Sequence, residues 1–175
     1  MQNMELIEMG RVMRKYIRLY IWILVFLSVV TLVVSKVLAE EWSYKDDRSS
    51  PEALIESYYY AINHRYYAQA YSYLINPPAD FNQWKEGYGD TKSVKVKFGA
   101  TSPDPGAGQI YWALPVALLA KKTDGKTVVY SGCYVIHMIN PGMQGDPPYK
   151  HMGIFRVSLK ETNQPFEEAV PKLCK

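Results

Sequence analysis

The hydrophobic pattern begins with one long uncharged stretch, residues 19–35, which is apolar on every face of a helix. At about 1.5 Å per residue it spans about 26 Å, against about 30 Å for a hydrocarbon core. Snorkelling of Lys36 would extend the usable span to Ala39. The cations that precede it are Arg11, Arg14, Lys15 and Arg18. The flank of a membrane segment that carries lysine and arginine usually stays in the cytoplasm. The pattern therefore predicts a membrane anchor from Leu19 to Ala39, with the C-terminal part of the chain exported. A buried core helix is disfavoured, since little else could enclose it.

The same segment also fits a cleaved signal peptide. Met13 and the two cations after it give a short basic start, and residues 37–39 fit a small-residue cleavage site before Glu40. Length favours the anchor, and both interpretations stay open. The prediction is therefore either a single pass through the inner (cytoplasmic) membrane with an extracytoplasmic domain, or a periplasmic or secreted protein cleaved after Ala39.

Helical spacing follows the targeting segment. A helix is predicted from Pro51, because Ser50 can cap the first free amides and proline suits the first turn. Apolar residues then recur on one face. The members of this face are Leu54, Ile55, Tyr58, Tyr59 and Ile62. We expect a break near His64, a second short helix through Leu74 and a third over residues 81–88.

Beyond Asp90 the period changes from helical to alternating. Strands are predicted over residues 94–98, 109–122, 127–139 and 151–160. Asp124-Gly125 is a strong hairpin signal between the second and third strands. The turn-rich residues 102–108 are predicted to connect the first two, and Pro115 and Gly132 are expected sites of a bulge or kink. Helices followed by antiparallel strands predict an α+β fold, a sheet curled over the helices.

Charge and length define the parts of the chain. Residues 1–39 hold five of the twenty lysines and arginines and two of the seventeen acidic residues, which leaves fifteen of each sign in residues 40–175. The net charge of +3 therefore comes from the targeting segment, and a neutral domain gives no electrostatic reason to expect nucleic acid as a partner. Residues 40–50 form a polar spacer, and residues 51–175 suit one extracytoplasmic domain.

The two cysteines, Cys133 and Cys174, are 41 residues apart. In an oxidising compartment such a pair readily forms a disulfide, which would tie the C-terminal tail to the middle of a strand. Two unrelated thiols are the alternative, but the export signal favours the bridge. The three histidines lack metal-ligand spacing, so no metal site is expected.

The residues also resemble a known superfamily. The string PEALIESYYYAINHRYYAQAYSYL from Pro51, followed by a short helix, a long antiparallel meander and GCYVIHMINPGMQGDPPYKHMGI at residues 132–154, is similar to the nuclear-transport-factor-2-like superfamily. The resemblance covers residues 51–160 and is greatest to uncharacterised bacterial envelope proteins of that class. It implies a cone-shaped sheet wrapped around a long helix, with a pocket at the open end. The superfamily includes enzymes such as ketosteroid isomerase, ligand-binding modules and assembly subunits, so membership fixes no function.

Tyrosine is the main candidate for site chemistry, because seven of fifteen tyrosines lie between residues 58 and 73. Apolar walls with hydroxyl tips would suit a flat or lipid-like ligand. The predicted pocket residues are Tyr58, Tyr59, Tyr66, Trp84, Trp112 and His137. Packing of aromatic rings between helix and sheet, or exposed tyrosines at a protein interface, would explain the same composition.

An isomerase-type enzyme needs a carboxylate base and a donor for the developing oxyanion. The four predicted strands contain no Asp or Glu, so no catalytic residue is assigned. His137 could serve as a base, although a histidine among apolar neighbours is more often structural. We find no phosphate-binding loop and expect no cofactor.

These observations favour a membrane-anchored or exported, non-catalytic binding module of the cell envelope. Its expected partners are the membrane, through Leu19 to Ala39 if the segment is retained, and envelope proteins or further copies of itself. The resemblance supplies a precedent, because the periplasmic assembly component of type IV secretion systems combines one membrane helix with a similar domain. The alternative is a small-molecule-binding protein or an isomerase-like enzyme that uses the cone pocket.

Overall fold

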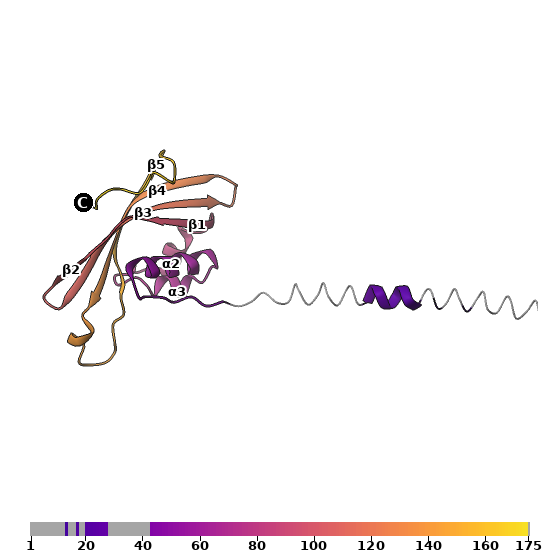
Figure 1. Ribbon diagram of the computed structural model, residues 1–175, viewed down its shortest axis with the longest axis horizontal. Coiled ribbons are helices and arrows are strands. Elements are labelled where there is room, and N and C mark those ends of the chain that lie inside the picture. The colour runs from indigo at the N-terminus through magenta and orange to yellow at the C-terminus, as the bar shows by residue number, and fades with distance from the viewer. Residues whose placement is uncertain (1–12, 14–16, 18–19, 28–42, 175) are drawn as a thin grey trace, which may run out of the picture. The chain divides into compact units, whose positions relative to one another are not determined.

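The computed structural model describes residues 13, 17, 20–27 and 43–174 (Figure 1). The chain divides into two compact units, Met1–Tyr44 and Lys45–Lys175. In the first unit, residues 20–27 are helical and all eight side chains are exposed. The rest of the predicted span, with Lys36 and the cleavage site after Ala39, lies outside the described residues. Among the described residues, no helix has the length and apolar character that crossing a membrane requires.

Three helices open the second unit: α2 (Pro51–Asn63), α3 (Tyr67–Tyr71) and α4 (Phe81–Glu86). The predicted cap is present, because Ser50 Oγ accepts a hydrogen bond from the Ala53 amide at 3.1 Å. α2 ends next to the predicted break, where Arg65 takes a φ of 60°. Asp80 caps α4 in the same manner, since its carboxylate accepts from the two amides of Asn82 and Gln83.

We expect Ser50→Ala to destabilise the protein by about 1 kcal/mol, because it leaves the Ala53 amide without its acceptor. Ser50→Asp should restore most of the loss, since a carboxylate can accept the same bond and suits the positive end of the helix dipole. Urea unfolding followed by circular dichroism measures both changes. Equal stability of the alanine variant and the wild type would show that water replaces the cap at no cost.

The sheet has five antiparallel strands: β1 (Thr91–Phe98), β2 (Pro103–Gly106), β3 (Gln109–Lys122), β4 (Thr127–Ile139) and β5 (Gly153–Thr162). The order is β1-β3-β4-β5, and β2 pairs with β3 beyond the end of β1 (Figure 1). This confirms the α+β class with a curved, open antiparallel sheet. β2 corrects the sequence prediction of a connecting turn at residues 102–108.

The expected irregularities lie elsewhere than predicted. The β3–β4 register runs without a shift through both Pro115 and Gly132. Register shifts occur instead between Thr91 and Ser93 on β1 and between Val135 and Ile136 opposite β5. Gly132 has a different role, because the backbone of β5 approaches it too closely for any side chain.

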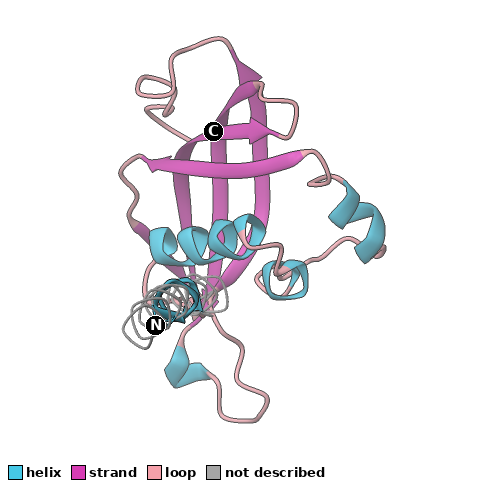
Figure 2. Cartoon of the chain, turned by 90° about the vertical axis from the view of Figure 1, so that its right-hand side faces the viewer, coloured by secondary structure: helices cyan, strands magenta, loops and turns pink. Residues whose placement is uncertain are grey.

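One face of the sheet, called the inner face, packs against α2, which lies across the strands (Figure 2). Leu54 and Ile55 of α2 meet Leu114 of β3 and Ile136 of β4, and all four are fully buried. Alternation along each strand then sends the intervening residues to the opposite face, called the outer face.

The C-terminal tail, residues 163–174, crosses the outer face. Cys174 is joined to Cys133 of β4 by a disulfide with a Cα–Cα distance of 5.8 Å, which confirms the predicted bridge. Ser131 Oγ also donates to the carbonyl of Ala169 at 2.6 Å, and Ala169 is 1% exposed. The tail is therefore built into the fold at two points close to each other on β4.

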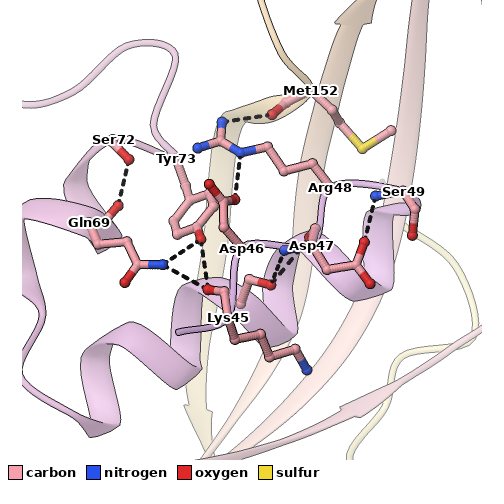
Figure 3. A network of polar contacts seen from close by, with 10 residues as sticks. Lys45, Asp46, Asp47, Arg48, Ser49, Gln69, Ser72, Tyr73 and Met152 are labelled. Atoms are coloured by element: carbon pink, nitrogen blue, oxygen red, sulfur yellow. Dashed lines mark hydrogen bonds and ion pairs between the residues drawn. The ribbon is translucent and has the colours of Figure 1, made fainter. Parts of the chain in front are cut away.

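The polar segment before α2 is also fixed to the domain (Figure 3). The Arg48 guanidinium lies 4.4 Å from the centre of the Tyr73 ring and donates to the carbonyl of Met152 at 3.3 Å. Gln69 Nε2 donates to the carbonyl of Lys45 at 2.7 Å and to the Tyr73 hydroxyl at 3.0 Å. Part of the segment predicted as a spacer thus contacts α3 and the residue that precedes β5.

Candidate functional site

Two adjoining clefts open between the inner face of the sheet and the helices, and we call them the inner clefts. The first has a volume of about 450 Å³ and is bounded by β1, β3, β4 and α4. The second, of about 400 Å³, is bounded by α2, residues 74–78, β4 and β5. Both are lined by Tyr59, Trp84, Tyr88 and Leu159. The shared wall makes them two parts of one site.

Two pairs of tyrosine hydroxyls supply the polar groups of this site. The Tyr58 and Tyr88 hydroxyl oxygens are 2.6 Å apart, as are those of Tyr59 and Tyr134. In each pair one hydroxyl donates and the other accepts, so one hydroxyl hydrogen per pair remains for a ligand. The rest of the lining of both clefts is mostly apolar, so the lining as a whole is amphipathic.

The helices and β4 place these four hydroxyls from distant parts of the sequence. Tyr58 and Tyr59 are neighbours on α2, with ring centres 5.0 Å apart and edge to face. Tyr58 reaches Tyr88, which follows α4, whereas Tyr59 reaches Tyr134 in the middle of β4. Trp84 then packs edge to face on Tyr88 at 5.3 Å and completes the common wall.

Burial keeps these phenols neutral. It raises the pKa of Tyr58 and of Tyr59 well above the ordinary value of 10.0, and it raises the pKa of Tyr134 and Tyr88 in the same direction. The cause is desolvation, because a phenolate in an apolar site loses its hydration. The four hydroxyls are therefore hydrogen-bond donors and acceptors at physiological pH, and no phenolate is available as a base.

The raised pKa values predict alkaline unfolding. Below pH 10 the buried tyrosines are protonated in both states and no stability is lost; above it the unfolded chain releases their protons while the folded chain retains them. Each of Tyr58, Tyr59 and Tyr134 should then lower the free energy of unfolding by about 1.4 kcal/mol for every pH unit above pH 10. Near-ultraviolet circular dichroism should be lost in one cooperative step, and the tyrosinate absorbance of the buried residues should appear in that same step. Ionisation of all fifteen tyrosines with unchanged dichroism would contradict the burial.

Charged side chains stay at the margins of the inner clefts. Lys122 borders the first cleft and pairs with Asp90 at 2.8 Å. Arg156 borders the second cleft, but it pairs in register with Val135, whose side chain belongs to the outer face. Asp104 of β2 and Glu161 of β5, which the sequence analysis did not place on strands, line neither cleft. The arrangement suits an uncharged ligand.

The structure brings together three of the six predicted pocket residues, namely Tyr58, Tyr59 and Trp84. Tyr66 and Trp112 are partly buried against the core and do not line the inner clefts. His137 lies on the outer face, where its ring is 4.6 Å from that of Tyr111 and its Nε2 pairs with the Gln109 amide oxygen. Burial lowers the pKa of His137.

Tyr88 and Tyr134 were not predicted as site residues. A signal for Tyr88 exists, because it follows Trp84 by four residues and helical spacing would place the two side by side. A signal for Tyr134 also exists, because it lies two residues before the buried Ile136 and therefore on the same face of β4. The pairing of these hydroxyls with α2 depends on the tertiary fold.

Among the described residues, no three His, Cys, Asp or Glu side chains come together as metal ligands would. A scan against protein-family models, a search of curated proteins and a search of solved structures each found no match to this chain, so its resemblance to the nuclear-transport-factor-2-like superfamily stays a prediction.

Proposed function

We propose that this protein is a membrane-tethered or exported, non-catalytic binding module of the cell envelope. In this proposal the inner clefts hold a neutral, largely apolar ligand that carries a hydrogen-bond acceptor such as a carbonyl, ether or hydroxyl oxygen. The observation that supports it most is the pairing of four tyrosine hydroxyls, one pair buried and one partly buried, along one amphipathic wall. Clefts of this size and lining are typical of small-molecule sites.

Two features support the extracytoplasmic location. The Cys133–Cys174 disulfide is the form that cysteines take in an oxidising compartment. The uncharged residues 19–35, with cations on their N-terminal side, are the kind of sequence expected to export the C-terminal part of the chain. A ligand that reaches the domain there could come from the membrane or from the surrounding fluid.

The lining of the inner clefts favours binding over isomerase-type catalysis. Proton abstraction next to a carbonyl needs a base with a pKa near the working pH, within hydrogen-bond reach of the substrate. Within the described part of the chain, the side chains around both clefts are apolar groups, phenols, amides, a threonine hydroxyl and marginal cations. His137, the one predicted candidate base, lies on the other face of the sheet.

The test uses Nile red, a neutral, flat dye with a carbonyl acceptor, and the full-length chain in a nonionic detergent. Leu159 lines both clefts, so the larger side chain of Leu159→Trp should occupy part of their volume and weaken saturable dye binding by tenfold or more. Tyr88→Phe should weaken it about fivefold, because a ligand hydrogen bond contributes about 1 kcal/mol.

Met143→Trp is the matched control, since Met143 is 68% exposed on the β4–β5 loop and borders neither inner cleft. Both tryptophan variants have the same N-terminal sequence, so dye in the micelles contributes equally to both measurements. Undiminished binding in the Leu159→Trp variant, with its thermal unfolding unchanged, would refute the proposed site.

A further inference from the structure

The outer face carries a second concave site, which shares only Phe155 and Arg156 of β5 with the second inner cleft. This outer groove has a volume of about 570 Å³ and lies between the C-terminal tail and the segment that leads into β2. Its floor consists of alternate residues of β3 and β4, namely Tyr111, Ala113, Pro115 and Val135. The C-terminal tail lies on the side of the sheet away from α2 (Figure 1).

The disulfide fixes one wall of the outer groove. Lys172, Leu173 and Cys174 line it, and Cys174 is bonded to Cys133. An earlier part of the tail is held by an ion pair, in which Lys97 Nζ lies 2.6 Å from the Glu167 carboxylate. A cross-linked wall is a preformed wall, which lowers the entropy that a ligand must overcome on binding.

The charges in the outer groove are mainly positive. Arg156 and Lys172 line it, and within the described residues neither takes part in an ion pair or a side-chain hydrogen bond. Asp104 is the carboxylate that lines the groove, and it pairs in register with Tyr111 at the β2 end. The two cations are therefore available to an anion.

Next to these cations lies an aromatic surface. The Phe155 ring packs edge to face on the Tyr111 ring, with centres 5.8 Å apart, and both residues line the groove. His137 lies beside both rings on the same face, with its ring centre 4.6 Å from that of Tyr111 and 6.1 Å from that of Phe155. A flat apolar body could lie on Tyr111 and Phe155 while its acidic group meets a guanidinium or ammonium group.

From these features we infer that the outer groove binds a small aromatic carboxylate. The volume lies in the range of small-molecule sites. The cations select the anionic group, and the floor of Tyr111, Ala113 and Val135 holds the ring. An acidic peptide would need a longer, open channel, whereas the tail closes this groove at one side. The inference does not depend on the proposed function, since the floor of the outer groove lies on the face opposite the inner clefts and the two sites share only Phe155 and Arg156 of β5.

The probe pair is naphthalene-2-carboxylate and its neutral isostere naphthalene-2-carboxamide, added to the isotope-labelled full-length chain in a nonionic detergent. The carboxylate should shift the amide resonances of Tyr111, Ala113 and Val135, and it should bind at least fivefold more tightly than the carboxamide. Added salt should weaken the carboxylate alone. Equal binding of both probes would overturn the inference, as would shifts confined to Trp84 and Tyr88.

Arg156→Gln and Lys172→Gln each remove one charge from an exposed side chain and should each weaken carboxylate binding about fivefold. Lys92→Gln, an exposed cation on β1, is the matched control and should leave binding unchanged. Unaltered binding in both groove variants would overturn the assignment, and so would stronger binding of a Glu-rich peptide at the same resonances. Lys172 lines the outer groove and neither inner cleft, so Nile red binding should be retained in Lys172→Gln.

Discussion

Replacing Gly132 by alanine should destabilise the protein by roughly 4 kcal/mol, enough to leave a large unfolded fraction in an ordinary domain. A Cβ at this position would overlap the carbonyl oxygen of Ser158 and lie 2.9 Å from the Cα of Leu159. Both obstacles are backbone atoms of β5, so no rotamer change relieves the clash. Chemical unfolding of purified Gly132→Ala, followed by circular dichroism, measures the loss.

Gly145→Ala is the matched control for this prediction. Gly145 has no heavy atom within 4 Å of the position that a Cβ would take, so its substitution should change the stability by less than about 0.5 kcal/mol. If Gly132→Ala were as stable as the control, β4 and β5 would have to separate at this point. Loss of the Gly132–Leu159 pairing would then be visible as faster amide exchange in β5.

The central hairpin could be predicted closely from the sequence. Alternating apolar residues on both sides of Asp124-Gly125 place β3 at Gln109–Lys122 and β4 at Thr127–Ile139, as the structure has them. β2 was missed because Pro103, Pro105 and Gly106 are residues typical of a turn. An edge strand tolerates prolines, since one side of it forms no ladder.

The candidate site shows where sequence reasoning ends. Tyr58 and Tyr59 were found because helical spacing places them on the inner face of α2. His137 was expected in the pocket. It lies on the same face of β4 as Cys133, whereas Tyr134 lies an odd number of residues away and so on the opposite face. Strand alternation therefore required Tyr134 and His137 to face opposite sides of the sheet. The predicted bridge from Cys174 to Cys133 would have placed the tail on the face that carries His137, and this consequence of the disulfide was not used.

The second large effect concerns the tail itself. The Cys133→Ser, Cys174→Ser double variant should lose about 4 kcal/mol of stability, because the disulfide closes a loop of 41 residues in the unfolded chain. Ser131 and Lys97 still hold the tail in the folded state, so the fold should persist and the outer groove should lose its fixed wall. Thermal unfolding of the double variant should match that of the reduced wild type.

A matched control separates the cross-link from the contacts of the last residues. Leu173 is 80% exposed, so Leu173→Ala shortens a neighbouring side chain with little expected change in stability. A double variant as stable as the wild type would mean that the unfolded chain gains no freedom when the bridge is removed. Since Ala169 is nearly fully buried against β4, its amide exchange reports directly whether the tail stays docked. Slow exchange with lowered global stability would place the effect in the unfolded state, whereas fast exchange would show that the bridge also holds the native tail in position.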